Sequence, residues 1–173
     1  MASTYLTRTP ASAGNRQTWT LSAWVKRSKL GDGEFIFYST DGSASDTRIE
    51  FGTDNTLKYS SQISNVLNTR LNTTQVFRDT SAWYHFVYSV DTTQATASNR
   101  AKLYVNGNQV TSFSTATYPS INTNTIVNDN TLHTIGRRSD GASNYFNGSM
   151  SHIHLIDGTA YDASYFGSTD SVT

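Results

Sequence analysis

Short β-rich segments with alternating polar and apolar side chains run through the whole chain, and no long window shows helical periodicity. Two of these segments, Trp19–Lys26 and Ser81–Val90, are unusually aromatic. A third, residues 102–105, leads into Asn106-Gly107, a pair typical of tight hairpins because both residues tolerate positive φ. Short strands separated by Gly, Asn, Asp and Ser clusters predict an antiparallel β-sandwich.

We expect one all-β domain over residues 1–173, a two-sheet antiparallel jelly roll with at most one short helix. The expected strands are Thr18–Lys26, Glu34–Ser39, Thr47–Gly52, Thr56–Ser60, Thr73–Arg78, Tyr84–Asp91, Ala101–Val105, Asn108–Thr111, Thr131–Gly136 and Gly148–Leu155. The predicted core is Leu21, Val25, Ile36, Phe86, Val105, Ile135, Ile153 and Leu155. Trp24 and Trp83 are expected to be at least half buried.

Charge is scarce in this sequence, and this limits its partners. Only 15% of residues are charged and the net charge is zero, with no Lys/Arg run, so we expect no nucleic-acid partner. Repulsion between copies is weak, which permits self-association. The chain has no cysteine, which excludes disulfides and Cys-ligated zinc. No apolar stretch reaches the ~18 residues of a membrane span.

Four motifs in order resemble laminin-G-like jelly rolls of the concanavalin A-like superfamily. They are the strand of Trp19, Leu21, Ser22, Trp24, Val25 and Lys26, then Trp83 with His85, then Leu103–Gly107, and finally Ile135-Gly136 with Phe146-Asn-Gly148 and Ser151–Ile156. The resemblance covers nearly the whole chain. It implies a sandwich used either to present carbohydrate-binding loops or to build extracellular and virion assemblies.

A narrower resemblance is to laminin-G-like domains in virion proteins of marine tailed phages. It rests on Arg8–Arg16, Thr92–Arg100 and His154–Gly158. This resemblance implies a tail-fibre or structural protein, located in a virion or outside the cell. Both ends of the chain are abrupt, so a fragment of a longer protein is expected.

Catalysis is not expected, although some members of the sandwich superfamily are glucanases. A retaining glycosidase needs two carboxylates ~5–5.5 Å apart, and the relatives place them on one strand in a Glu-x-Asp-x-Glu pattern. No segment here has that pattern, and Ser151–Ile156 contains no acid. A Gly-x-Ser-x-Gly elbow is also missing. Glycoside hydrolysis is therefore a weaker hypothesis than glycan recognition or structural assembly.

Histidines and loop acids are the candidate metal ligands. His152 and His154, two apart on a strand, are expected on one face, where they could bind a metal, become protonated together as the pH falls, or simply face solvent or an interface. His85 is interpreted as a hydrogen-bonded packing residue. The resemblance implies calcium as a candidate cofactor, but the loop acids are scattered and typical of turns: Asp32, Asp41, Asp46, Asp129 and Asp140. We assign no metal ligands and no other cofactor.

A carbohydrate site requires an aromatic ring for a sugar face and a few groups that bond hydroxyls. The best cluster in the sequence is the loop around residues 137–145, with Tyr118 of the long loop 112–130 as an added ring. The predicted sugar-binding residues are Tyr118, Arg138, Asp140, Asn144 and Tyr145. The alternative is a polar loop with Tyr145 folded into the core.

The long loop Ser112–Asn130 carries apolar anchors at Ile121, Ile126 and Val127, which we interpret as an assembly surface. The alternative is that this loop folds back and buries them in its own sandwich. Two functions therefore stay open. One is a non-enzymatic module that recognises a cell-surface glycan, and the other is a structural module that assembles with its own copies or with other virion proteins.

Overall fold

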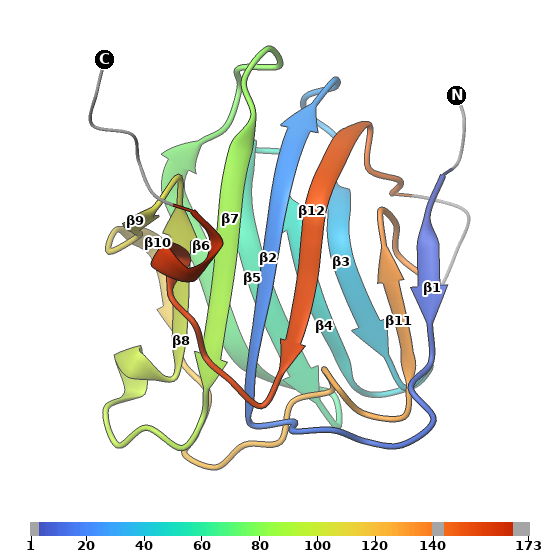
Figure 1. Ribbon diagram of the computed structural model, residues 1–173, viewed down its shortest axis with the longest axis vertical. Coiled ribbons are helices and arrows are strands. Elements are labelled where there is room, and N and C mark those ends of the chain that lie inside the picture. The colour runs from blue at the N-terminus through green and yellow to red at the C-terminus, as the bar shows by residue number, and fades with distance from the viewer. Residues whose placement is uncertain (1–3, 140–143, 168–173) are drawn as a thin grey trace.

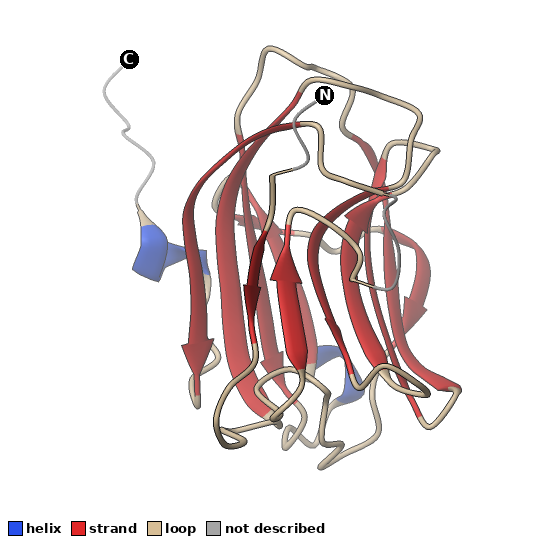
Figure 2. Cartoon of the chain, turned by 90° about the vertical axis from the view of Figure 1, so that its right-hand side faces the viewer, coloured by secondary structure: helices blue, strands red, loops and turns tan. Residues whose placement is uncertain are grey.

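Two antiparallel sheets pack face to face in the computed structural model, which describes residues 4–139 and 144–167. Figure 1 shows the five-stranded sheet in front of the seven-stranded one, and Figure 2 shows the two layers from the side that carries β1. The predicted all-β sandwich is therefore confirmed. No helix in the described ranges is long and apolar enough to span a membrane.

Strand order defines two edges on the same side of the sandwich. The seven-stranded sheet runs β1 (Leu6–Arg8), β11 (Leu132–Ile135), β3 (Glu34–Thr40), β4 (Asp46–Phe51), β5 (Thr56–Ile63), β6 (Val66–Val76) and β10 (Phe113–Thr117). The five-stranded sheet runs β12 (Gly148–Asp157), β2 (Thr18–Arg27), β7 (Tyr84–Asp91), β8 (Ala101–Val105) and β9 (Asn108–Gln109). In Figure 1 the edge strand β12 is the rightmost strand of the front sheet, and β1 is the rightmost strand of the rear sheet.

Alternation along β2 explains why the sheets pack as they do. Trp19, Leu21, Ala23 and Val25 are buried in the core between the sheets. Successive strand residues point to opposite faces, so Thr20, Ser22 and Trp24 lie on the outer face. The core is rich in aromatic rings, with Phe51, Phe77 and Phe86 in mutual contact at centroid separations of 5.3–5.8 Å. Such pairs add to the gain from burial alone.

The strand predictions succeed where alternation is strong. The strands Tyr84–Asp91 and Ala101–Val105 have the predicted bounds, and the Asn106-Gly107 hairpin has φ values of 48° and 84°. The strand expected at Thr73–Arg78 instead runs from Val66 to Val76. Strand β10 lies inside a segment that we expected to be a loop. Its local sequence did not indicate a strand, because β10 is held mainly by pairing with β6. Two short 3-10 helices, η1 (Ala97–Asn99) and η2 (Ala163–Phe166), exceed the one helix expected.

The predicted core is confirmed at Leu21, Val25, Ile36, Phe86 and Val105, and Trp24 and Trp83 are more than half buried. Ile135 and Ile153 are partly buried and pack against the core. The prediction for Leu155 is wrong, because its side chain is 39% exposed. Leu155 pairs with Leu21 on the inward face, but β12 is an edge strand, and no further strand of the described residues covers that side.

The loop between β10 and β11 folds over its own sandwich. Ile126 and Val127 are only 3% and 0% exposed, whereas Ile121 is 51% exposed. The Trp19 indole donates to Thr125 Oγ1 at 3.0 Å, which fastens the loop to the core. Ile126 and Val127 are therefore buried in their own sandwich, which was the alternative to an assembly surface. Of the three predicted anchors, Ile121 alone is exposed.

A buried ion pair joins the two sheets. Arg27 ends β2 and Glu34 begins β3, and their Nε and Oε2 atoms are 3.0 Å apart with both side chains fully buried. Arg27 Nη1 also donates to the Phe77 carbonyl and to Asn55 Oδ1, and the guanidinium lies 4.3 Å from the Phe51 ring centroid. Removing one partner of such a pair leaves an uncompensated buried charge.

Replacing Glu34 by Ala should therefore lower the free energy of unfolding by about 3–5 kcal/mol. Arg27→Ala should cost a similar amount, and the double variant less than the sum, because the two effects share one interaction. Chemical denaturation measures all three. Lys29→Ala, which removes an exposed pair with Asp32, is the control and should leave the midpoint unchanged. Additive losses at Arg27 and Glu34 would contradict the coupling.

The three tryptophans should differ sharply in solvent access. Trp19 is fully buried, whereas Trp24 and Trp83 are 37% and 41% exposed. In a Trp24→Phe/Trp83→Phe variant, Trp19 fluorescence should be blue-shifted and poorly quenched by acrylamide, because the quencher cannot reach a ring inside the core. The same protein in denaturant is the control. Equal quenching in both conditions would show that Trp19 is not in the core.

Candidate functional site

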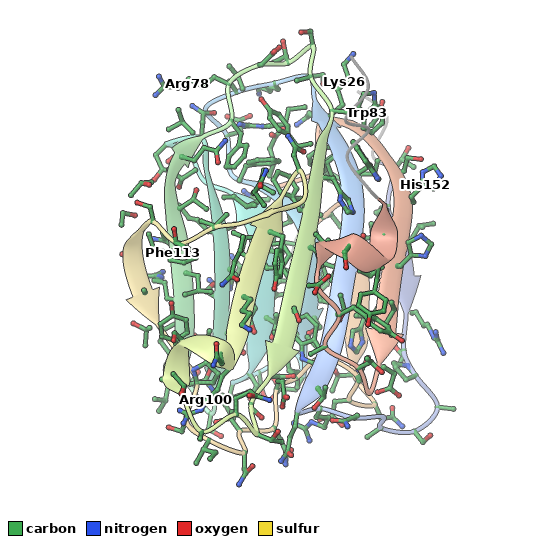
Figure 3. All side chains as sticks on the ribbon, turned by 60° about the vertical axis from the view of Figure 1, so that its left-hand side comes forward. Lys26, Arg78, Trp83, Arg100, Phe113 and His152 are labelled. Atoms are coloured by element: carbon green, nitrogen blue, oxygen red, sulfur yellow. The ribbon has the colours of Figure 1, made fainter. Side chains whose placement is uncertain are left out.

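The outer face of the five-stranded sheet carries exposed aromatic rings on neighbouring strands. Trp24 of β2 lies opposite His85 of β7 on one side and Ser151 of β12 on the other. Trp83 immediately precedes β7, and its ring lies near the upper end of the sheet in Figure 3, beside Lys26. Partly exposed tryptophans on a sheet face are uncommon, because burial of such rings normally stabilises the core.

His85 fixes the position of Trp24. The two rings stack at a centroid distance of 4.9 Å and an interplanar angle of 17°. His85 Nε2 lies 2.9 Å from Ser22 Oγ, and its side chain is almost completely buried. Burial lowers the pKa of His85, since the charged imidazolium would lose its hydration. The expectation of a hydrogen-bonded packing residue is confirmed.

A β-bulge in β12 brings two further histidines to this face. The register changes between Ser151, opposite Trp24, and His154, opposite Ser22, so His152 and Ile153 share one partner position. His152 adopts φ of 48° within this bulge. Without the extra residue, Ser151 and His154 would point to opposite faces. The bulge therefore allows Ser151, His152 and His154 to line the same surface.

The segment after β12 folds back across the sheet. Thr20 Oγ1 donates to the Thr159 carbonyl and accepts from the Tyr161 N–H. Helix η2 follows, capped by the Asp162 carboxylate, which accepts from Ser164 N at 2.9 Å. Phe166 then stacks on His154 and meets His85 edge-on, at centroid distances of 6.2 and 6.1 Å. Figure 2 shows η2 outside the five-stranded layer.

These residues line two adjoining pockets on the outer side of the five-stranded sheet. We call the surface formed by the residues that line the two pockets the Trp–His face. One, of about 540 Å³, is lined by Trp24, Trp83, Ser151, His152 and Phe166. The other, of about 340 Å³, is lined by Ser22, Trp24, His85, His152, His154, Ile156, Tyr165 and Phe166. Trp24, His152 and Phe166 belong to both. Rings beside a few hydroxyl and imidazole groups can stack on an apolar ring face and bond its polar substituents.

A third cavity, of about 680 Å³ and larger than these two, lies at the open edge between β1 and β12. Leu6, Phe37, Ile135 and Leu155 line it together with Arg8 and Asp157. Its polar groups are largely occupied: Asp157 Oδ1 accepts from Asn15 N and Asn128 Nδ2, and the His133 ring nitrogens contact Asn128 N and the Thr131 carbonyl. Among the described residues that line this cavity, the aromatic rings are those of Phe37 and His133, both of which are buried, so the cavity fits sugar recognition less well.

The described parts of the predicted sugar-binding loop, residues 137–139 and 144–145, lie toward the upper end of the sandwich, between β11 and β12 (Figure 1). Tyr145 and Tyr5 have ring centroids 6.3 Å apart, and Asn144 Nδ2 donates to the Gly33 carbonyl. Arg138 lies 5.8 Å from the Tyr38 ring centroid. Asp140 lies outside the described residues.

Tyr118 does not join this loop. It packs against the core beside Pro119, whose carbonyl accepts from Arg100 at the lower end of the molecule (Figure 3). The structure therefore groups Asn144 and Tyr145 at one end of the sandwich and places Tyr118 at the other. Arg137 begins this loop but is not among the five predicted sugar-binding residues, and its guanidinium lies 3.6 Å from the Tyr5 ring centroid.

The loop acids are committed to local structure. Although partial burial opposes it, hydrogen bonds from Ser43 and Ser45 lower the pKa of Asp41 to about 2. Asp32, Asp46 and Asp129 form ion pairs with Lys29, Arg48 and Arg16. Within residues 4–139 and 144–167, no group of three or more His, Cys, Asp or Glu side chains is arranged to hold a metal. The described acids thus act as turn and ion-pair residues.

Sequence reasoning missed the Trp–His face, although one signal for it was available. Trp24 falls in the outward phase of β2, with Thr20 and Ser22, while Leu21 and Val25 occupy the inward phase. A large ring in the polar phase of an alternating strand predicts an exposed platform. The part played by Phe166 could not be read in the same way, because it depends on the return of the chain after β12.

Several solved structures share this fold. Domain 4 of AbnA, an extracellular GH43 arabinanase from Geobacillus stearothermophilus in complex with arabinotriose, is 19% identical, with a TM-score of 0.61 over 85% of this chain and 64% of that one. The CBM40 module of a Ruminococcus gnavus sialidase, bound to α2,3-sialyllactose, is 12% identical, with a TM-score of 0.58 over 92% and 95%. Mouse laminin α1 domains LG4-5 are 10% identical, with a TM-score of 0.61 over 90% and 40%.

At these identities the structural likeness establishes the fold. No curated protein matches the sequence. A family profile described as the concanavalin A-like lectin/glucanases superfamily matches residues 2–163, which include every strand and both tryptophans of the Trp–His face. The chain belongs to the laminin-G group of the concanavalin A-like lectin/glucanases superfamily.

Proposed function

We propose that this chain is a non-catalytic glycan-binding module and that its ligand lies on the Trp–His face. The observation that carries the proposal is the pair Trp24 and Trp83, each about two-fifths exposed and both lining one pocket. Exposed rings held in place by a scaffold offer large contact area at little loss of conformational freedom. Such rings, with an apolar body and a polar handle, are enriched at recognition surfaces.

The pocket chemistry suits a sugar ring. A pyranose has an apolar C–H face and a rim of hydroxyls, so it needs a flat ring and a few donors and acceptors. Trp24 and Trp83 supply the rings, and Ser151 and His152 supply polar atoms on the same wall. Binding sites for small ligands typically enclose ~300–1,000 Å³, and both pockets fall in that range.

Structural relatives support the same class of ligand. The arabinanase domain and the CBM40 module are solved with arabinotriose and sialyllactose respectively. Their low identity transfers no residue role to this chain, so the choice of face rests on Trp24 and Trp83. The cluster of Tyr5, Arg137 and Tyr145 is the competing site on this molecule, because it also combines rings with a cation.

We also propose a virion or extracellular setting for the module, on the basis of the phage-like segments noted in the sequence. The second candidate function is self-assembly with copies of the chain or with other virion proteins. Zero net charge and the exposed Ile121 favour it, while the burial of Ile126 and Val127 removes two of its three anchors. A strictly monomeric chain at high concentration would leave glycan recognition as the better proposal.

Substituting Trp83 by Ala should weaken glycan binding at least about tenfold, because a stacked ring contributes roughly 1.4 kcal/mol or more. A glycan array identifies ligands, and calorimetry on the best one measures the affinity. Tyr145→Ala is the matched control on the competing loop and should bind as the native chain does. The reverse pattern would move the site to that loop. An array without any specific ligand would reject the proposed function.

No release of reducing sugar is expected from β-glucans, alginate or agar. Strand β12 carries a single acid, Asp157, at its end, and that carboxylate accepts hydrogen bonds from Asn15 and Asn128. A retaining reaction needs a second carboxylate nearby. A reducing-end assay on purified protein measures this. Turnover that disappears in Asp157→Asn would show that the chain is an enzyme.

A further inference from the structure

Three of the four histidines of this chain line one pocket. His85, His152 and His154 surround the smaller pocket of the Trp–His face, and His133 lies in the separate cavity at the open edge. Among the described residues, no Asp, Glu, Lys or Arg lines either pocket of the face. The charge of the site therefore depends on its imidazoles.

The charged groups nearest to this face lie at its margins. Lys26 follows Trp24 by two residues on β2 and lies close to Asp79 in the loop before β7. On the other side, Lys102 of β8 faces Asp162, the cap of η2. Tyr104, Tyr161 and Tyr165 are further titratable groups beside this face. Tyr84, Tyr88 and Arg27 of the same sheet pack toward the core, and Asp157 of β12 lines the cavity at the open edge. Carboxylates, tyrosines and lysines do not normally change charge between pH 5.5 and 7.5, whereas histidine does.

The two exposed histidines are placed to meet a ligand. His152 and His154 are both solvent-exposed on β12. His152 Nδ1 lies 2.7 Å from Ser151 Oγ, which leaves Nε2 available to the pocket. His154 stacks on Phe166 through the face of its ring. The ring nitrogens lie at the edge of the imidazole, so this contact does not use them. His85 is buried beneath them against Trp24 and Ser22, so it supports the wall of the pocket.

We propose that this pocket selects glycans by charge in a pH-dependent manner, with neutral sugars bound near neutrality and carboxylated sugars favoured at acidic pH through His152 and His154. The inference rests on the proposed function and names the ligand class of the same site. The carboxyl groups of acidic sugars, like other carboxylic acids, remain ionised at pH 5.5, because their pKa values lie near ~3–4. Protonated imidazoles then meet a carboxylate in a pocket with no competing acid.

The test uses one sugar in two charge states. Trigalacturonate and its fully methyl-esterified form share one sugar backbone and differ in carboxylate charge and in the added methyl groups, and sialyllactose with its methyl ester forms a second pair. Calorimetry at about pH 7.5 and pH 5.5 gives the ratio of the acid's affinity to that of the ester. We expect this ratio to rise at least about fivefold at the lower pH, the size of roughly 1 kcal/mol from exposed charge pairs. It should fall back in high salt.

A His152→Gln/His154→Gln variant should abolish the rise in the ratio, because it removes the two exposed imidazoles of the pocket. The stability of the fold must be followed in parallel. Burial lowers the pKa values of His85 and His133, so the unfolded chain binds more protons below about pH 6.5 and the folded state loses stability there. Circular dichroism melts at both pH values identify conditions in which every variant is folded.

The outcomes separate the two proposals. If neutral and acidic sugars bind with a ratio that does not change with pH, the charge selection is wrong and the glycan-binding function stands. A rise in the ratio that persists in the double variant also overturns the role of His152 and His154. If neither the four test sugars nor any array glycan binds at either pH, both proposals fail.

Discussion

The Arg27–Glu34 ion pair sets the spacing of the two sheets at one end of the sandwich. Arg27 belongs to the five-stranded sheet and Glu34 to the seven-stranded one, and neither charge has access to water. Arg27 Nη2 has no hydrogen-bond partner among the described residues, so the guanidinium relies on Glu34, Asn55, the Phe77 carbonyl and the Phe51 ring. Because an unpaired buried charge is so costly, β2, β3 and the segment after β6 must meet at this point.

Positioning of the Trp–His face follows from that constraint. Arg27 is inward at the end of β2, so strict alternation places Val25 inward and Trp24 outward. The pairing of β2 with β7 then sets His85 beside Trp24, and pairing with β12 supplies Ser151 and the bulge. Phe166 closes the arrangement from a segment anchored on Thr20. The site is thus built on regular strands, whose side-chain directions are fixed by the sheet.

Much of the fold could be predicted from alternation and turn chemistry, which act locally. The strands around Trp24 and Phe86 and the Asn106-Gly107 hairpin depend on near neighbours in sequence. Strand β10 and the exposure of Leu155 depend instead on which strands become neighbours, and a single sequence does not show this. The predicted sugar loop holds Asn144 and Tyr145 together, whereas Tyr118, expected as an added ring from the long loop, lies at the other end of the sandwich because that loop folds over its own core. The Trp–His face required strand register, including a one-residue shift that alternation cannot reveal.

The bulge at His152 has a consequence for how copies of this protein can meet. Strand β12 is a long edge strand, and an uninterrupted edge offers a row of unpaired N–H and C=O groups to any passing strand. The left-handed residue at the bulge breaks the even spacing of that row and bends it. An incoming strand could therefore pair with only half of β12 at a time. Edge-to-edge sheet growth, the route by which β-proteins aggregate, is interrupted by the same residue that shapes the pocket.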